Sequence, residues 1–212
     1  MPRTELTVAT AAGPAAVELS RPPAASALVL LTHGAGAGVQ TVDLLAVRDA
    51  LVAVGVAVGL VTQPYRLAGR GAPPAPARQD PAWSEVVAAV RRRRGLSRVP
   101  LVLGGRSNGA RVACRTARTT GAGAVVALAF PLHPPGRPDR SRLPELQDAG
   151  VPVLVVQGDR DPFGMPPPGD GRRVVVVPRG DHGLKQDPAA VARAVTAFVT
   201  SVLGEYKTAH SD

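Results

Sequence analysis

The stretch VPLVLGGRSNGA, residues 99–110, decides the fold predicted for this chain. An apolar run typical of a buried strand, 99–104, leads into Gly105-Arg106-Ser107-Asn108-Gly109, and we expect a helix to follow Ser107. The small residues two positions either side of Ser107 allow a sharp strand–turn–helix that pushes the hydroxyl out of the sheet. Because the chain has 23 glycines in 212 residues, this pattern is weak evidence by itself. The motifs around this pattern must therefore decide whether it has a functional meaning.

Three other apolar strands also end in loops with polar residues. Strand 27–32 ends in the glycine-rich loop 33–38, whose backbone N–H groups can face an anion. Strand 151–157 runs into a loop with two aspartates, and strand 173–177 precedes the loop that carries His182. Since the carboxyl ends of parallel strands meet at one edge of a sheet, we expect these loops to lie together.

The alternation of strands and helices predicts an α/β fold, a doubly wound and mostly parallel sheet of about seven or eight strands. The expected strands are 5–9 and 15–19 as an opening antiparallel pair, then 27–32, 56–62, 99–104, 124–130, 151–157 and 173–177. The expected helices are 42–54, 81–94, the segment after Ser107 to about 119, 141–149 and 188–203. Glycines and prolines predict a flexible loop over 65–80, and the short interval between the strands near 130 and 151 leaves no room for a cap domain.

Composition predicts one globular domain, 1–212, with a core from about 15 to 204 and a short polar tail over 205–212. Hydrophobic residues make up 45% of the chain, enough to bury a core. The longest apolar stretch, 51–61, is well below the roughly 20 residues that a membrane span needs. A single cysteine, Cys114, and an amino terminus without a secretory signal favour a cytoplasmic location.

The four motifs in this order resemble the α/β-hydrolase superfamily, and the resemblance extends from about residue 15 to 204. The His-Gly-Ala-Gly loop at 33–36, Gly-Gly-Arg-Ser at 104–107 and Asp-His-Gly-Leu at 181–184 look most like the compact dienelactone-hydrolase-like branch. Dienelactone hydrolases themselves carry cysteine where this chain has Ser107. The resemblance implies an α/β-hydrolase fold and a catalytic triad in the order serine, acid, histidine.

The residues themselves support the same chemistry. Ser107 becomes a useful nucleophile only with a base in hydrogen-bond reach, and His182 is the candidate. The imidazole then needs a carboxylate to fix its tautomer and stabilise its cation. We expect Asp161 in this role, because the chain must turn at Gly158 before a carboxylate can face the histidine loop; Asp159 is the alternative. Taken singly, Ser107 could instead be a helix N-cap and Asp161 a turn residue.

The expected oxyanion hole consists of two backbone N–H groups, those of Asn108 and Ala35, with Gly34 as an alternative to Ala35. Three further residues are expected to line the site: His33, Arg106 and His133. For His33 we favour ordering of the glycine loop through hydrogen bonds over direct catalysis.

The sequence also limits which cofactors and partners we expect for this protein. No spaced set of cysteines and histidines occurs, so we expect neither metal nor other cofactor. The net charge of +9 and the run Arg91-Arg92-Arg93-Arg94 invite a nucleic-acid interpretation, but helix capping explains the run better. With 3% aromatic residues and arginine far above lysine, the composition is more typical of a GC-rich bacterial genome.

Two functions follow as hypotheses. The first is a serine esterase acting on a small-molecule acyl substrate, as a monomer or homodimer that binds neither nucleic acid nor membrane. The second is a catalytically idle binding or scaffold module of the same fold. Such modules usually lose a triad residue, and this chain retains all three.

Overall fold

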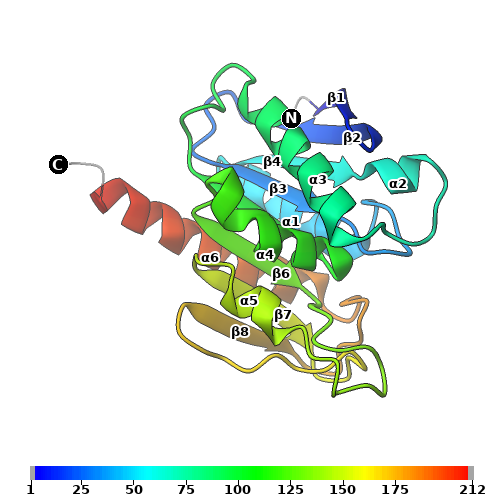
Figure 1. Ribbon diagram of the computed structural model, residues 1–212. Helices are drawn as coiled ribbons and strands as arrows, with labels where there is room; N and C mark the ends of the chain where they lie inside the picture. Colours follow the sequence, from blue (N-terminus) through cyan, green and yellow to red (C-terminus); the bar gives the residue numbers. More distant parts are fainter. Residues whose placement is uncertain (1–2, 210–212) are drawn as a thin grey trace.

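The apolar runs of the sequence form one sheet of eight strands in the computed structural model, which describes residues 3–209 (Figure 1). The strands are β1 (Arg3–Thr10), β2 (Gly13–Ser20), β3 (Leu28–Thr32), β4 (Ala57–Thr62), β5 (Leu101–Arg106), β6 (Ala124–Leu128), β7 (Val153–Gly158) and β8 (Arg172–Val177). Their order in the sheet is β1-β2-β4-β3-β5-β6-β7-β8. In this order, every neighbouring pair from β4 through β3 to β8 is parallel. Strand β2 is antiparallel to both of its neighbours, β1 and β4. The predicted mostly parallel α/β sheet is confirmed.

Helices cover both faces of this sheet. They are α1 (Val42–Ala53), α2 (Pro64–Leu67), α3 (Pro76–Arg91), α4 (Asn108–Thr120), α5 (Leu143–Gln147) and α6 (Pro188–Ala209). In Figure 1, α3, α4 and α5 lie in front of the sheet, and α1 and α6 lie behind it. Strands enclosed in this way are apolar on both sides, and every residue of β3, β6 and β7 is buried.

The segment between β6 and β7 contains α5 and no further helix or strand. The prediction of a fold without a cap domain is therefore confirmed. The carboxyl ends of the parallel strands lie on the right in Figure 1, where α2 follows β4, and no large insertion covers this edge.

Three predicted boundaries were wrong. The expected loop over 65–80 contains α2 and the first turn of α3, because Pro64 and Pro76 begin these helices at a position where proline's missing N–H costs nothing. Helix α3 ends at Arg91, so three of the four consecutive arginines, 92–94, lie beyond it and are exposed. The expected polar tail continues α6 to Ala209, and residues 210–212 lie outside the described part of the chain.

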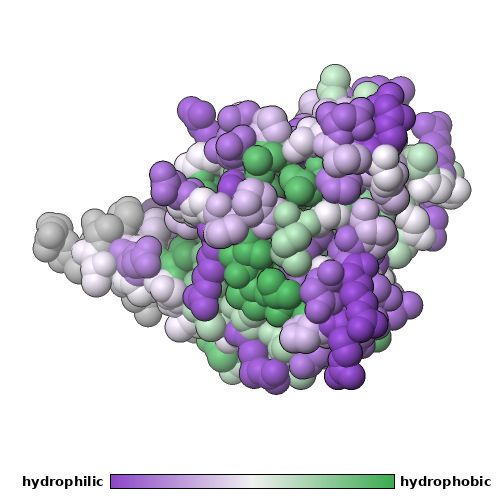
Figure 2. Space-filling model, turned by 90° about the horizontal axis from the view of Figure 1, so that it is seen from below, coloured by the Kyte–Doolittle hydropathy of each residue, from purple (hydrophilic) through white to green (hydrophobic). Residues whose placement is uncertain are grey.

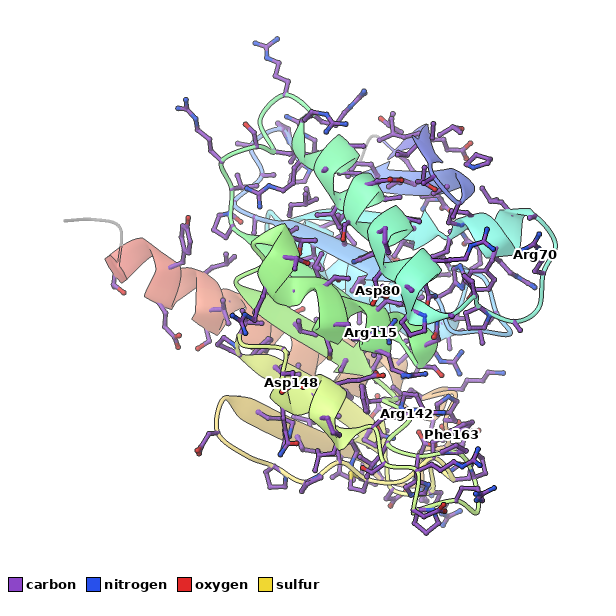
Figure 3. All side chains as sticks on the ribbon, in the orientation of Figure 1. Arg70, Asp80, Arg115, Arg142, Asp148 and Phe163 are labelled. Atoms are coloured by element: carbon purple, nitrogen blue, oxygen red, sulfur yellow. The ribbon has the colours of Figure 1, made fainter. Side chains whose placement is uncertain are left out.

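Ion pairs from α4 join the three helices on the front face. Arg115 Nη2 lies 2.6 Å from Asp80 Oδ1 of α3, and Figure 3 shows these two side chains between the helices. Arg111 Nη2 lies 2.6 Å from Glu145 Oε1 of α5. In both pairs a second guanidinium nitrogen bonds the other carboxylate oxygen. This bidentate geometry fixes the angle between the helices as well as their distance.

Strand β8 closes one edge of the sheet and is less covered than the other parallel strands. Only Val177 of its six residues is buried, and Val176 is 48% exposed. The view from below in Figure 2 faces this edge and shows an apolar area between hydrophilic borders. No helix within residues 3–209 combines the length and apolar character that crossing a membrane requires.

Candidate active site

Ser107 occupies the sharp turn between β5 and α4. Its φ of 54° lies in the left-handed region, a strained conformation for a residue with a side chain. The turn is tight enough to press against β3, since a Cβ added to Gly105 or Gly109 would lie 2.5 Å from the Thr32 carbonyl oxygen. The Ser107 N–H donates to the Leu128 carbonyl of β6 at 2.8 Å. The two glycines are therefore what permits the strained turn.

The hydroxyl of Ser107 lies at one end of a hydrogen-bonded relay. Ser107 Oγ is 2.9 Å from His182 Nε2, and His182 Nδ1 is 2.8 Å from Asp161 Oδ2. Because the carboxylate can only accept, Nδ1 carries the proton and Nε2 is free to accept from the serine hydroxyl. The structure thus brings together the three residues that the sequence predicted would act jointly, each on a loop that follows a different strand.

Asp161 is fixed more firmly than the sequence indicated. Its side chain is fully buried, and Oδ2 also accepts from Gln157 Nε2 at 2.8 Å. Oδ1 accepts from the Phe163 N–H at 2.9 Å. The alternative acid, Asp159, is exposed and makes no side-chain hydrogen bond with any described residue. The geometry favours Asp161.

Phe163 is a site residue that sequence reasoning missed. Its ring packs on the His182 imidazole, with ring centroids 4.2 Å apart and planes tilted by 32°. Figure 3 shows it among the loops at the carboxyl edge of the sheet. His133, expected to line the site, lies behind this loop: its N–H donates to the Phe163 carbonyl, and its ring packs against Gly164. His133 therefore supports the acid loop, and within residues 3–209 it makes no hydrogen bond with Ser107, Asp161 or His182.

His33 orders the glycine loop, as we expected. The imidazole is fully buried; Nδ1 donates to the Gly34 carbonyl at 2.8 Å, and Nε2 accepts from the Gln63 N–H at 3.0 Å. Burial lowers the pKa of His33, and both ring nitrogens are committed to main-chain groups. Tyr65 packs beside it, and burial raises the pKa of Tyr65 to about 12.

This bond also sets the direction of the next N–H group. The Gly34 carbonyl points to the imidazole, and no cis peptide occurs in the described chain, so the Ala35 N–H of the same peptide points the opposite way. A Cβ added to Gly34 would lie 3.2 Å from Ser107 Cβ, which places the loop next to the serine. The N–H groups of Ala35 and of Asn108, the first residue of α4, donate to no acceptor within residues 3–209. These are the two N–H groups for which the sequence predicted the role of an oxyanion hole.

Two buried glutamines, Gln63 and Gln79, form a hydrogen-bonded chain that supports the glycine loop. Sequence reasoning also missed these two residues. Gln63, directly after β4, donates to Thr32 Oγ1 and accepts from Gln79 of α3. Both glutamines line a cavity of about 90 Å³ beneath Tyr65. The one signal available in the sequence was a polar residue at the end of an apolar strand, a pattern that Gln63 shares with Gln157.

Arg106 reaches across the site. Its Nη2 donates to the His182 carbonyl at 2.8 Å, and its Nε lies 3.4 Å from Asp43 Oδ2 of α1. The side chain predicted to line the site thus connects β5 to the histidine loop and to α1. Within residues 3–209 no cluster of three or more metal-ligating side chains occurs.

The fold and the relay define an α/β hydrolase, and comparison with known proteins agrees. The model of the alpha/beta hydrolase domain family matches residues 25–196, so the chain belongs to this family. No curated protein matches the chain.

Solved structures with the same fold cover nearly the whole chain. An α/β serine hydrolase without a lid from Xanthomonas campestris has 20% identity and a TM-score of 0.75, covering 95% of this chain and 96% of its own. Est1E from Butyrivibrio proteoclasticus has 15% identity and a TM-score of 0.73, over 94% and 99%. A dienelactone hydrolase from Anabaena variabilis has 19% identity and a TM-score of 0.72, over 96% and 97%. The expected compact, dienelactone-hydrolase-like architecture is confirmed.

Gly109→Ala should lower the free energy of unfolding by about 1–3 kcal/mol, because the new Cβ would meet two backbone carbonyls that cannot move aside. The same change at Gly204, an exposed position of α6 with nothing within 4 Å, should instead raise it by up to about 1 kcal/mol. Urea denaturation of both variants measures the difference. A neutral or stabilising Gly109→Ala would contradict the tight contact between α4 and β3.

Proposed function

We propose that this protein is a serine hydrolase that cleaves carboxylic esters, or related acyl bonds, of small or exposed substrates. The observation that carries the proposal is the relay from Ser107 through His182 to Asp161, with both hydrogen bonds shorter than 3.0 Å. Its support comes from the strained turn that exposes Ser107, and from the free N–H groups beside it.

In the proposed reaction, His182 Nε2 takes the proton of Ser107 as the hydroxyl oxygen attacks the substrate carbonyl carbon. The carbonyl oxygen becomes an oxyanion, which the N–H groups of Ala35 and Asn108 stabilise. His182 then gives its proton to the leaving alkoxide, the C–O bond breaks, and an acyl-serine ester remains. Water attacks this ester with His182 again as base, which releases the acid and restores Ser107.

The remaining residues assist in this scheme without touching the acyl group. Asp161 holds the tautomer that leaves Nε2 free and stabilises the imidazolium. His33 aims the Ala35 N–H, and the packed ring of Phe163 keeps the His182 imidazole oriented. No cofactor is needed, because every proton transfer has a side chain to perform it.

The open edge of the sheet supports small or exposed substrates. Without a cap, the site has little apolar wall to bind a long acyl chain, and water has free access to the acyl-enzyme. A serine hydrolase without a lid is among the similar structures, and Est1E has been solved with ferulic acid bound. A monomer or homodimer in the cytoplasm, acting on a small molecule without nucleic acid or membrane, completes the proposal.

Ser107 should be covalently labelled by a fluorophosphonate at pH 8, since His182 activates its hydroxyl. Mass spectrometry of the peptide that contains Ser107 measures the modification. Ser107→Ala should take no label and should lose ester hydrolysis almost completely. A folded wild-type protein that stays unlabelled, while a control esterase reacts, would indicate the idle scaffold module instead.

The two aspartates of the acid loop should respond differently to the same change. Asp161→Asn should lower kcat by about 10⁴-fold, because the amide stabilises the wrong tautomer of His182. Asp159→Asn should leave kcat within about twofold, since the Asp159 side chain is exposed. Steady-state kinetics with p-nitrophenyl acetate tests both variants, and the reverse ranking would move the role to Asp159.

Short acyl chains should be the better substrates. We expect kcat/KM for p-nitrophenyl acetate and butyrate to exceed that for the palmitate, because an uncapped site gains little binding energy from a long chain. Kinetics below the micelle-forming concentration of each ester provides the comparison. A higher kcat/KM for the long-chain ester would require an apolar tunnel and would refute this part of the proposal.

A further inference from the structure

Arg106 contacts two segments that are remote from it in sequence. It is the last residue of β5 and directly precedes Ser107. Its Nη2 donates to the main-chain carbonyl of His182 at 2.8 Å, and its Nε lies 3.4 Å from a carboxylate oxygen of Asp43. One side chain therefore connects the strand of the nucleophile, the loop of the base and the first turn of α1.

Within residues 3–209, Asp43 has no polar partner besides Arg106. Its side chain is fully buried, and neither carboxylate oxygen accepts a hydrogen bond from any residue in the described chain. A buried carboxylate is costly unless an opposite charge compensates it, and Arg106 is the cation in contact. Since the Arg106 side chain is only 14% exposed, water screens this attraction weakly. Asp43 thereby restrains the guanidinium.

The histidine loop, 178–187, is held by the buried side chain of Leu184 and by few main-chain hydrogen bonds to other segments of the described chain. Several of its hydrogen bonds are internal, among them those from Gly183 and Leu184 to Asp181. The Arg160 N–H donates to the Gly180 carbonyl and ties the loop to the acid loop after β7. The bond from Arg106 ties it to β5. It therefore fixes the backbone of His182 relative to the residue next to Ser107.

We propose that Arg106, held by Asp43, is a positioning residue that sets the distance between His182 Nε2 and Ser107 Oγ. The inference rests on the proposed function of the relay. Arg106 bonds the His182 main chain and leaves both imidazole nitrogens to the relay, so it acts on geometry and takes no part in proton transfer. Misplacement of a catalytic group by about 1 Å can cost 10²-fold in rate.

Arg106→Met removes the guanidinium while keeping a long apolar side chain. We expect kcat for p-nitrophenyl acetate, and the rate of fluorophosphonate labelling, to fall by about 10²-fold, with KM changed less than about threefold. Arg115→Met is the matched control, because Arg115 is 15% exposed and also bonds a carboxylate, far along α4 from the relay. It should lower thermal stability and leave kcat within about twofold.

Two conservative changes separate positioning from general loosening of the fold. Arg106→Lys keeps one cationic donor and should recover part of the lost kcat. Asp43→Asn should lower kcat less than Arg106→Met, and adding it to Arg106→Met should have no further effect on kcat, because Asp43 acts through Arg106. Additive losses in the double variant would overturn the role assigned to Asp43.

A spectroscopic measurement keeps this test independent of activity. The Nδ1 proton that His182 shares with Asp161 should give a low-field proton NMR signal, identified by its loss in His182→Ala. We expect the signal in the wild type and in Arg115→Met, and its loss through exchange with water in Arg106→Met. If the wild type neither reacts nor labels, the proposed function fails while this readout still stands. An unchanged signal, kcat within twofold, or a loss confined to KM in Arg106→Met would overturn the inference.

Discussion

The rest of the site depends on the contact between the backbone of the serine turn and the end of β3. The Thr32 carbonyl fills the space that a Cβ atom at Gly105 or Gly109 would need, and the His33 carbonyl adds to this at Gly109. With no side chain between them, the turn and the glycine loop approach each other to van der Waals distance. Gly34 consequently packs on Ser107, so the serine and the glycine loop become neighbours through main-chain packing alone. Long side chains, which lose more entropy on ordering, are not required for this step.

Around this contact, each residue of the relay is held by a hydrogen bond to its own loop or to a neighbouring strand. Gln157 and the Phe163 N–H hold Asp161, Arg106 holds the loop of His182, and Leu128 of β6 accepts from the Ser107 N–H. Each of these groups is part of the backbone or is hydrogen-bonded to the backbone or to buried groups. Few of them can therefore change their orientation freely. Such preorganisation is what electrostatic catalysis requires, because the dipoles need not reorient during the reaction.

Sequence alone predicted the strands, their parallel arrangement and the three residues of the relay, because each rests on a local pattern. Glycines at 105 and 109 and the loops after apolar strands are visible without coordinates. The partners of the relay were missed, since the roles of Phe163, Gln157 and Asp43 depend on contacts between remote segments. The start of α3 was misplaced for a different reason: Pro76 and Pro81 are both plausible first residues of a helix, and the structure includes Pro81 within α3. The contacts that support the earlier start involve remote residues, since Gln79 bonds Gln63 and Asp80 pairs with Arg115.

The sparse packing over β8 has a consequence for the order in which parts of the molecule unfold. The crossover from β7 to β8 is a proline-containing loop without a helix, and five of the six β8 residues are partly or fully exposed. Segments with little buried apolar surface open at a lower free energy than the core, so we expect amide protons of β8 to exchange sooner than those of β3 or β6. His182 lies on the loop after β8, whereas Ser107 follows β5 at the covered centre of the sheet. We therefore expect local opening at this edge to displace His182 while Ser107 stays in place, so that the relay breaks at a lower temperature than that of global unfolding.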